Sequence, residues 1–411
     1  MSNEPISRRE VLGRGAMIAV GLSAPRWLAA VAQSDLMRLA GGGEVDPDNI
    51  LVVCQLTGGN DGLNTVIPYT SSSYKSARPT LAIPEADVLK LDAEFGLHPT
   101  MKGIQTLYTE GKVAIIQSVG YPNPNRSHFK SMDIWQSASP DGSLPYGWIG
   151  RSMDQEIAAN RYNPVLTVGL STERPLALTA KSAAIPCFAS LADIQSMVGD
   201  PDSERLLRQV QGQDAAQGTA IRTIQDANRA ALDAMAELNT RLGGAKPAQT
   251  YGDHAFGKGF QQIAHLVLAS PKTRVVYFSH GGFDTHSRQK DAHATLMQQF
   301  SEAVYAFQRE MEATGKANKV TVLVFSEFGR RVDENGSQGT DHGEAAPMFL
   351  IGGRVKGGMH GPKPDLQNLS RGDVPWKIDF RQVYATALDQ WMGSDSGVVL
   401  GQAFTHLDVI K

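Results

Sequence analysis

Residues 50–64 read ILVVCQLTGGNDGLN, a short apolar run that ends abruptly in a glycine-rich polar turn. Short continuous runs rich in Val, Ile and Leu and bounded by turn residues are typical of β-strands buried on both faces. Three further runs have the same character, and a shorter fifth candidate follows them. They are residues 113–119, 274–278, 319–325 and 348–351.

Helical patterns separate these predicted strands, and the clearest covers residues 285–314, directly before the strand at 319–325. Strands that alternate with helices favour a layered α/β fold around a mostly parallel sheet. Residues 201–245 differ, because they are polar and show almost no strand signal. Their apolar residues fall near one helical stripe, which predicts a helical insertion that packs one face on the core; a dimer-forming helix is the alternative. The stripe comprises Ile221, Ile224, Leu232, Met235, Leu238 and Leu242.

Length and composition exclude several classes of protein. The chain has 411 residues, of which 41% are hydrophobic and 20% charged, as in ordinary globular proteins. Its formal net charge of −3 argues against nucleic acid as a partner. Beyond residue 33 no uncharged apolar run is long enough to cross a bilayer, so we expect no stable membrane span in the mature form.

The amino terminus predicts export. Residues 5–13 read PISRREVLG, and the Arg8–Arg9 pair followed by Val11 and Leu12 matches a twin-arginine signal. The diluted apolar segment that follows ends in a small-x-small cleavage motif at residues 30–32. We therefore expect a signal peptide at residues 1–32, a linker at 33–49 and one domain at 50–411. The expected location is periplasmic or secreted, with the twin-arginine export machinery as a partner; an amphipathic amino-terminal helix is the alternative.

The chain has two cysteines, Cys54 and Cys187. Cys54 lies within the first predicted strand, where a small apolar filler is the simplest interpretation. A disulfide between the two is compatible with an oxidising compartment, but nothing in the sequence requires it.

Acids and histidines follow one predicted strand after another. The list comprises Asp61 in TGGNDGLN, Asp284 and His286 in SHGGFDTH, Glu327 in SEFGRR, and Asp341 and His342 in GTDHGE before the fifth strand. Ligands of open α/β sheets bind outside the carboxyl ends of the strands, where these side chains would meet if the strands are parallel. Carboxylates and imidazoles without thiolates suit a divalent ion such as zinc or manganese, and either one or two ions are compatible with this set.

Each of these residues also has a purely structural interpretation. Asp284 could cap the following helix, and Asp61 could stabilise its own turn. Glu327 could form a surface ion pair with Arg330 or Arg331.

A candidate nucleophile follows the second predicted strand, in YPNPNRSHF. Ser127 needs a base or a metal to activate its hydroxyl, and Arg126 could hold an anionic phosphate or sulfate through two hydrogen bonds. A polar loop in which Ser127 caps a helix is an equally simple interpretation.

At these motifs the sequence resembles the domain-of-unknown-function 1501 family, exported bacterial proteins placed in the alkaline-phosphatase-like superfamily. The matching segments are RREVL, LVVCQLTGGNDGLNTVIPY, NRSHF, GGFDTH, SEFGR and GTDHG. The resemblance implies a three-layer αβα sandwich and a metal site like that of phosphatases and sulfatases. Asp61 would then bind metal, Ser127 would occupy the nucleophile position, and the other acids and histidines would complete the metal site.

Two departures from that superfamily pattern matter. Phe328 follows Glu327 where a histidine ligand would be expected, and the Cys/Ser-x-Pro-x-Arg motif of formylglycine sulfatases does not occur. The functional hypothesis is therefore an exported metal-dependent hydrolase of small anionic phosphate or sulfate esters. The alternative is a non-catalytic periplasmic binding or assembly protein that keeps the fold.

Overall fold

The computed structural model describes residues 45–198, 205, 232–233, 235–244 and 246–411. The predicted signal peptide, most of the linker, and the part of the predicted insertion that holds Ile221 and Ile224 lie outside these residues.

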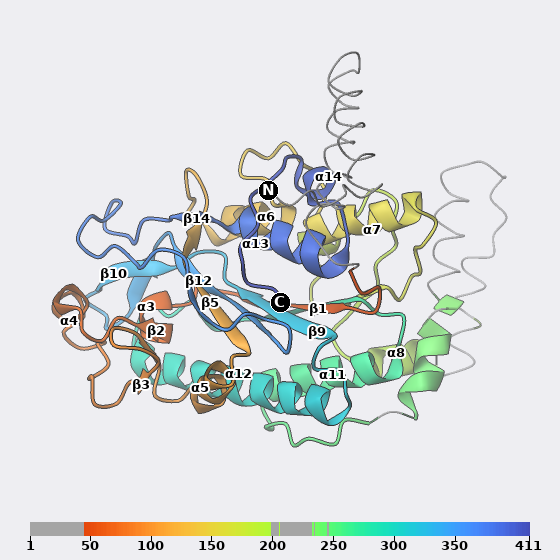
Figure 1. Ribbon diagram of the computed structural model, residues 1–411, viewed down its shortest axis with the longest axis horizontal. Coiled ribbons are helices and arrows are strands. Elements are labelled where there is room, and N and C mark those ends of the chain that lie inside the picture. Colours follow the sequence, from red (N-terminus) through yellow and green to blue (C-terminus); the bar gives the residue numbers. More distant parts are fainter. Residues whose placement is uncertain (1–44, 199–204, 206–231, 234, 245) are drawn as a thin grey trace, which may run out of the picture.

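A mixed sheet forms the centre of the described part, and helices cover both of its faces (Figure 1). The strand order is β13–β5–β12–β9–β1–β8–β6–β7, and β14 also pairs with β5. In chain order the strands are β1 (Ile50–Leu56), β5 (Val113–Gly120), β6 (Thr167–Leu170), β7 (Cys187–Phe188), β8 (Val275–His280), β9 (Val320–Phe325), β12 (Ala346–Gly352), β13 (Gly358–His360) and β14 (Ile378–Asp379). The expected three-layer α/β architecture is confirmed.

Each of the five predicted strand segments lies in a strand of this sheet, and the sheet is mostly parallel as expected. The exception is β12, which pairs antiparallel with both β5 and β9. Its amino end therefore lies at the edge where the parallel strands have their carboxyl ends. This reversal brings the segment before β12 to the same edge as the loops that follow β1, β8 and β9.

Successive strand residues pack on opposite faces, as the two-residue repeat of a strand requires. On β1, Val52 and Cys54 belong to one core cluster, whereas Leu51 and Val53 belong to the other. The first face is covered by α5 (Lys102–Thr109), α8 (Leu191–Val198), α11 (Ala255–Ala269) and α12 (Gln289–Ala313). The second is covered by α6 (His128–Ser137), α7 (Trp148–Ala158), α13 (Phe380–Thr386), the π-helix η2 (Ala387–Met392) and α14 (Ser396–Leu400).

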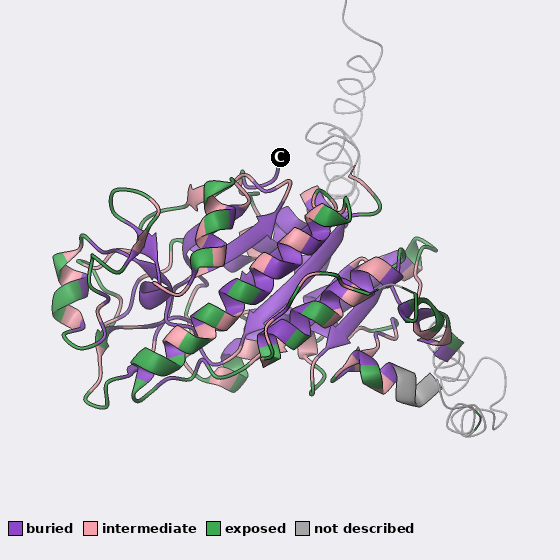
Figure 2. Cartoon of the chain, turned by 90° about the horizontal axis from the view of Figure 1, so that it is seen from below, coloured by how far each residue is buried: buried purple, intermediate pink, exposed green. Residues whose placement is uncertain are grey.

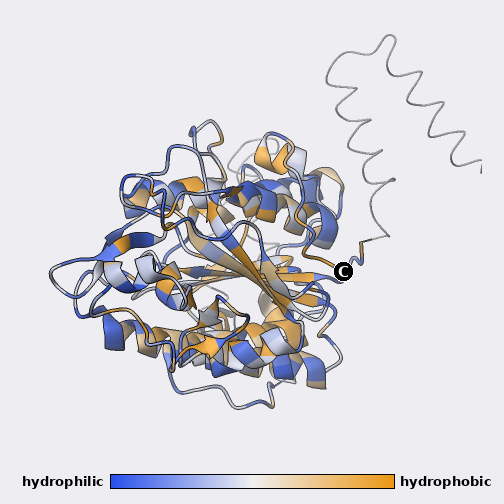
Figure 3. Ribbon diagram, turned by 60° about the vertical axis from the view of Figure 1, so that its left-hand side comes forward, coloured by the Kyte–Doolittle hydropathy of each residue, from blue (hydrophilic) through white to orange (hydrophobic). Residues whose placement is uncertain are grey.

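Helices α11 and α12 lie side by side along the sheet, with buried residues inward and exposed residues outward (Figure 2). Their apolar residues belong to the same core cluster as one face of the sheet, and the strands of that sheet are largely hydrophobic (Figure 3). Residues 285–314 were predicted to be helical, and α12 confirms this. The described part of the predicted insertion is helical at residues 232–233 and 235–242, and its apolar side chains join the same core. They are Leu232, Met235, Leu238 and Leu242.

Smaller elements surround the carboxyl edge of the sheet. They are α3 (Gly62–Thr65), α4 (Ser72–Ala77), the small sheet of β2 (Val66–Ile67), β3 (Leu89–Lys90) and β4 (Gly96–Leu97), and the antiparallel pair β10 (Arg330–Glu334) and β11 (Thr340–His342). The 3₁₀ turn η1 (Leu176–Leu178) instead packs against α6 and α7.

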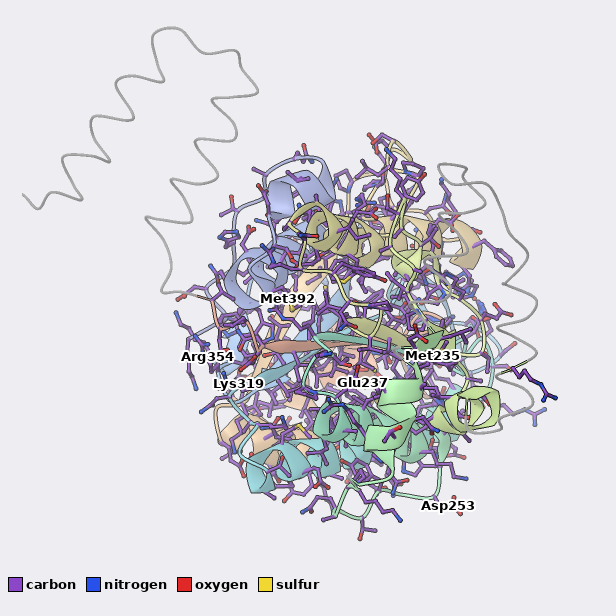
Figure 4. All side chains as sticks on the ribbon, turned by 90° about the vertical axis from the view of Figure 1, so that its right-hand side faces the viewer. Met235, Glu237, Asp253, Lys319, Arg354 and Met392 are labelled. Atoms are coloured by element: carbon purple, nitrogen blue, oxygen red, sulfur yellow. The ribbon has the colours of Figure 1, made fainter. Side chains whose placement is uncertain are left out.

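The described chain begins at the opposite, amino edge of the sheet. Asp46 is ion-paired with Lys319, which directly precedes β9. The guanidinium of Arg354 lies over the ring of Trp391. Lys319, Arg354 and Met392 lie on the same side of the molecule (Figure 4). The segment that joins the predicted linker to the domain therefore enters far from the loops at the carboxyl edge.

Cys54 and Cys187 are both free thiols. Their strands, β1 and β7, are separated in the sheet by β8 and β6, and the two side chains pack on opposite faces. Bridged cysteines need Cα atoms within about 7 Å, so this fold does not bring them together for a disulfide.

Candidate metal centre

Four side chains from three segments gather at the carboxyl edge. Asp284 follows β8, His342 ends β11, and His128 begins α6; potential ligand atoms of these three all lie within 4.8 Å of one another. Asp284 Oδ1 lies 3.1 Å from Nε2 of His342 and 3.1 Å from Nε2 of His286. The two Nε2 atoms are 2.9 Å apart. Asp284 Oδ2 is 3.4 Å from His128 Nε2.

Hydrogen bonds on the far side of two rings leave Nε2 of both facing the cluster. His342 Nδ1 is 2.7 Å from the carbonyl oxygen of Arg126, which can only accept, so Nδ1 must carry the proton. His128 Nδ1 is 2.9 Å from the carboxylate of Glu327. A carboxylate behind a ring orients the imidazole and raises the basicity of its other nitrogen, as in many carboxylate–histidine–metal triads.

Glu327 is completely buried and also accepts the backbone N–H of Gly58 at 2.7 Å. Its hydrogen bond raises the pKa of His128 above the usual value of a histidine. The structure therefore places Glu327 behind a histidine of the cluster. A surface ion pair with Arg330 or Arg331 is wrong, because a fully buried carboxylate cannot form one.

Arg330 is also completely buried, and it joins the loops of the site. Its guanidinium donates to Asp284 Oδ1 at 2.8 Å. Its remaining hydrogen bonds go to the backbone carbonyls of Gly58, Gly59, Phe283 and Thr340. Burial by itself would raise the pKa of Asp284, but the Arg330 guanidinium, through its hydrogen bond and its positive charge, lowers it to about 2. Asp284 is thus ionised at any pH at which the protein would work.

The glycine pair of the TGGND turn allows this close approach. Gly58 has φ +123°, a conformation that residues with a Cβ rarely adopt. A Cβ there would lie 2.4 Å from the backbone nitrogen of Asp284. The glycines therefore let the turn after β1 pack directly against the backbone that carries Asp284.

The donor set fits a divalent cation. In tetrahedral zinc sites with bonds of 2.0–2.1 Å, ligand atoms are about 3.3 Å apart, and the separations of 2.9, 3.1 and 3.4 Å quoted above are close to this. His128 Nε2 is buried and has no hydrogen-bond partner among the described residues. With its proton on Nδ1, His342 would point a lone pair at a carboxylate oxygen, a repulsive arrangement unless a cation lies between them. Burial lowers the pKa of His342, which favours its neutral, ligand-competent form.

The ring of Phe328 packs against both ligand-type imidazoles, with ring centroids 4.9 Å from His128 and 4.6 Å from His342. The residue that replaces the histidine expected from the superfamily pattern thus forms an apolar wall of the cluster. Water is excluded from that side of the site.

Asp341 and His286 lie at the exposed rim. His286 Nδ1 is 3.4 Å from Asp341 Oδ1, which also accepts a hydrogen bond from Asn335 at 3.1 Å. Asp341 therefore lies behind His286, in the same relation that Glu327 has to His128. Asp284 does not cap α12, because the N-cap position of that helix is Arg288.

Asp61 lies apart, in a buried polar network. Its carboxylate pairs with Arg78 at 2.6 Å, both side chains are fully buried, and Gln289 donates to the same oxygen. Its other oxygen accepts the backbone N–H groups of Leu63 and Asn64 and so caps α3. Although burial opposes ionisation, the Arg78 guanidinium lowers the pKa of Asp61. The structure gives Asp61 the turn-stabilising role that was the simpler alternative.

Ser127 and Arg126 immediately precede His128. Ser127 is exposed at the N-cap position of α6, but its side chain makes no capping hydrogen bond. The hydroxyl therefore remains available one residue from the cluster. Arg126 turns its carbonyl to His342, while its guanidinium is ion-paired with Asp373.

Sequence reasoning missed His128 and Arg330 as members of the site. His128 stands in the NRSHF motif, in which the serine suggested a nucleophile and the arginine an anion site. Arg330 was considered only as a partner of Glu327. No signal in the sequence showed that β12 is antiparallel, and this reversal is what keeps the segment with His342, directly before β12, beside the loops after β1 and β8.

The family described as "Protein of unknown function (DUF1501)" matches residues 48–402. The chain belongs to this family. No curated protein matches its sequence. Among the described residues, no helix has the length and apolar character needed to span a membrane.

Several solved structures are similar to this DUF1501 chain. Alkaline phosphatase from the Antarctic bacterium TAB5 is 10% identical, with a TM-score of 0.35, and the match covers 75% of this chain and 92% of the phosphatase. The PsFucS1 sulfatase from Pseudoalteromonas sp. is 11% identical, with a TM-score of 0.37 and coverage of 94% and 75%. The periplasmic domain of EcEptC from Escherichia coli, in complex with Zn, is 11% identical, with a TM-score of 0.35 and coverage of 76% and 74%. Because these TM-scores are below 0.5, the matches say nothing about activity.

Proposed function

We propose that this DUF1501 protein is an exported, metal-dependent hydrolase of phosphate or sulfate esters. The observation that carries the proposal is His342, whose Nδ1 is committed to a carbonyl while its Nε2 faces Asp284 and His286. Two atoms with lone pairs, His342 Nε2 and Asp284 Oδ1, then converge, and a cation between them removes their repulsion. The alkaline-phosphatase-like resemblance of the sequence motifs supports the same conclusion.

In this proposal His128, Asp284, His286 and His342 hold one divalent ion, zinc or manganese. Such an ion supplies Lewis-acid polarisation of an ester oxygen. Glu327 and Asp341 orient two of the histidines, and Arg330 fixes the carboxylate of Asp284. We leave Asp61 out of the ligand set, because Arg78, Gln289 and the start of α3 occupy its carboxylate.

The proposed nucleophile remains Ser127. Its hydroxyl lies in the residue before His128 and is exposed, so an ester phosphorus or sulfur at the cluster would be accessible to it. Arg126 would have to exchange its pairing with Asp373 for the substrate anion. That requirement favours the second candidate, a non-catalytic binding protein, in which the arginine stays paired.

The export route is part of the proposal. The Arg8–Arg9 motif indicates the twin-arginine machinery, which carries folded cargo. Because the described chain begins at the amino edge of the sheet, opposite the cluster, the metal centre can form in the cytoplasm with the signal segment still attached.

Metal analysis of the purified mature protein tests the metal centre. After chelation and reconstitution with zinc or manganese, we expect about one ion per chain in the wild type. His342→Ala and His128→Ala should lose it, whereas His360→Ala should not, because His360 hydrogen-bonds to a backbone carbonyl outside the cluster. A wild-type protein that retains neither ion would refute the metal centre.

Ester turnover is measured separately on the reconstituted protein, with aryl phosphates and aryl sulfates. Hydrolysis of either ester that disappears in His342→Ala supports the hydrolase. A fully loaded protein that hydrolyses neither ester would instead favour the binding protein.

A further inference from the structure

A second polar cluster lies on the other side of Arg126 from the metal centre. The carbonyl of Arg126 faces His342, while its guanidinium pairs with Asp373 and comes within 4.0 Å of Glu344. The two clusters are therefore separated by the length of one arginine. Neither Asp373 nor Glu344 takes part in the proposed reaction.

Both acids are buried, and the cluster contains unpaired polar atoms. Exposed fractions of the Asp373 and Glu344 side chains are 0% and 2%. Glu344 accepts from Arg371 at 2.8 Å and from Ser370 at 3.2 Å. Among the described residues, neither Asp373 Oδ1 nor Arg126 Nε has a hydrogen-bond partner. Buried polar atoms are nearly always paired, so an orphaned one needs an explanation, such as a bound ligand, water or ion.

An open hollow adjoins this cluster. Its wall includes Asn123, Glu344, Ser370, Arg371 and Trp376, with prolines beside the first and the last of these. It thus combines an aromatic side chain with an amide, a hydroxyl, a guanidinium and the carboxylate of Glu344, which is paired with that guanidinium. The Arg371 side chain is 66% exposed although one of its nitrogens pairs with Glu344. It can therefore donate to a ligand without breaking that pair.

The backbone of the hollow is strained at two of its wall residues. Asn123 has φ 55° and Arg371 has φ 54°, in the left-handed region. Asparagine tolerates this conformation, but for arginine it costs about 1–2 kcal/mol. Such strain persists where the surrounding structure imposes it, and it is concentrated at ligand-binding positions. Here it fixes where the Arg371 guanidinium emerges.

We propose that this hollow binds an acidic sugar unit, the part of the substrate that carries the ester to the metal centre. The C–H face of a sugar ring packs on the indole of Trp376, and Asn123 and Ser370 bind its hydroxyls. The planar guanidinium of Arg371 pairs with the sugar carboxylate. The link to an ester substrate rests on the proposed function, but the sugar site itself does not.

Binding is measured by isothermal titration on chelator-treated protein, so that turnover plays no part. The probes are the trisaccharides of galacturonate, glucuronate and mannuronate, each compared with its neutral methyl ester. We expect saturable binding of at least one acid, at least about tenfold tighter than its methyl ester. Arg371→Met and Trp376→Leu should each weaken it at least about tenfold. Lys377→Ala, next in the chain but outside the wall, should stay within about twofold.

Absence of binding for all three acids would overturn the proposal, as would equal binding of acid and ester. So would unchanged binding in both wall variants, provided that circular dichroism shows them folded. Because the assay needs neither metal nor catalysis, failure here leaves the hydrolase proposal standing. Failure of ester turnover likewise leaves the sugar site standing.

Discussion

Replacing Arg330 with methionine should damage both the stability of the domain and its metal centre. Methionine keeps an unbranched stem of similar reach but removes all of the donors. Lost are the hydrogen bond to Asp284 and those to the carbonyls of Gly58, Gly59, Phe283 and Thr340. Three loops are then no longer joined.

The magnitude follows from what is left unpaired. A buried carbonyl that is left without any donor costs about 1–3 kcal/mol. At most three of the four carbonyls are left so, because that of Phe283 still accepts the backbone N–H of Thr285. Partial relaxation and water entry reduce the sum, so we expect a loss of about 4–5 kcal/mol in the free energy of unfolding, near the upper limit for one substitution. With an unfolding entropy of about 2.1 cal/mol/K per residue, a domain of about 360 residues shifts by about 1.3 °C per kcal/mol, so the melting temperature should fall by about 5–7 °C. Metal affinity should fall about 10–100-fold, as for other groups that support ligands from behind.

The assay is thermal unfolding of chelator-treated protein followed by circular dichroism, and then zinc binding by chelator competition at a temperature where each variant is folded. Arg331→Met is the matched control, because that side chain is 40% exposed and its nearest acid lies 3.9 Å away. The control should change the free energy of unfolding by less than about 1 kcal/mol. If Arg330→Met melts within about 2 °C of the wild type, or binds zinc equally well, the reasoning is wrong.

Three further outcomes are expected. Ser127→Ala should lower ester turnover at least about a hundredfold with metal content unchanged; equal turnover would exclude Ser127 as nucleophile. Replacing Arg8 and Arg9 together by lysine should leave the precursor in the cytoplasm, since lysine lacks the guanidinium geometry; normal export in a fractionation assay would contradict this. Burial, and to a lesser extent the charge of Glu344, raise the pKa of Asp373 to about 6, although Arg126 and Arg331 act to lower it. Between about pH 4 and pH 6 the folded state therefore keeps a proton that the unfolded state has lost. The free energy of unfolding should fall as the pH rises through this range, by at most about 3 kcal/mol. In denaturant titrations at several pH values, the Asp373→Asn variant should not show this fall in the free energy of unfolding. A pH profile like that of the wild type would show that Asp373 does not cause it.

The sequence predicted correctly those features that depend on one short segment of the chain alone. The apolar runs predicted the strands, because a strand buried on both faces must be apolar along its length. The polar clusters after them correctly marked the loops that meet at one edge. Asp284, His286 and His342 do lie together there, and Asp341 lies behind His286.

The remaining predictions depended on partners far away in the chain. Asp61 and Asp284 look alike in the sequence, since each follows a strand in a glycine-rich turn. Only the fold places Arg78 beside the first and the histidines beside the second. Likewise, Glu327 was predicted as a ligand, but the fold buries it behind His128.

What this sequence determines by itself is the layered fold and the edge of the sheet at which its chemistry lies, because hydrophobic pattern and turn residues are local properties. The tertiary structure decides which polar side chains face one another. That choice depends on the antiparallel direction of β12, which keeps the segment with His342 at the carboxyl ends of β1 and β8. Strand direction is set by long-range pairing and packing, and no single stretch of the chain encodes it.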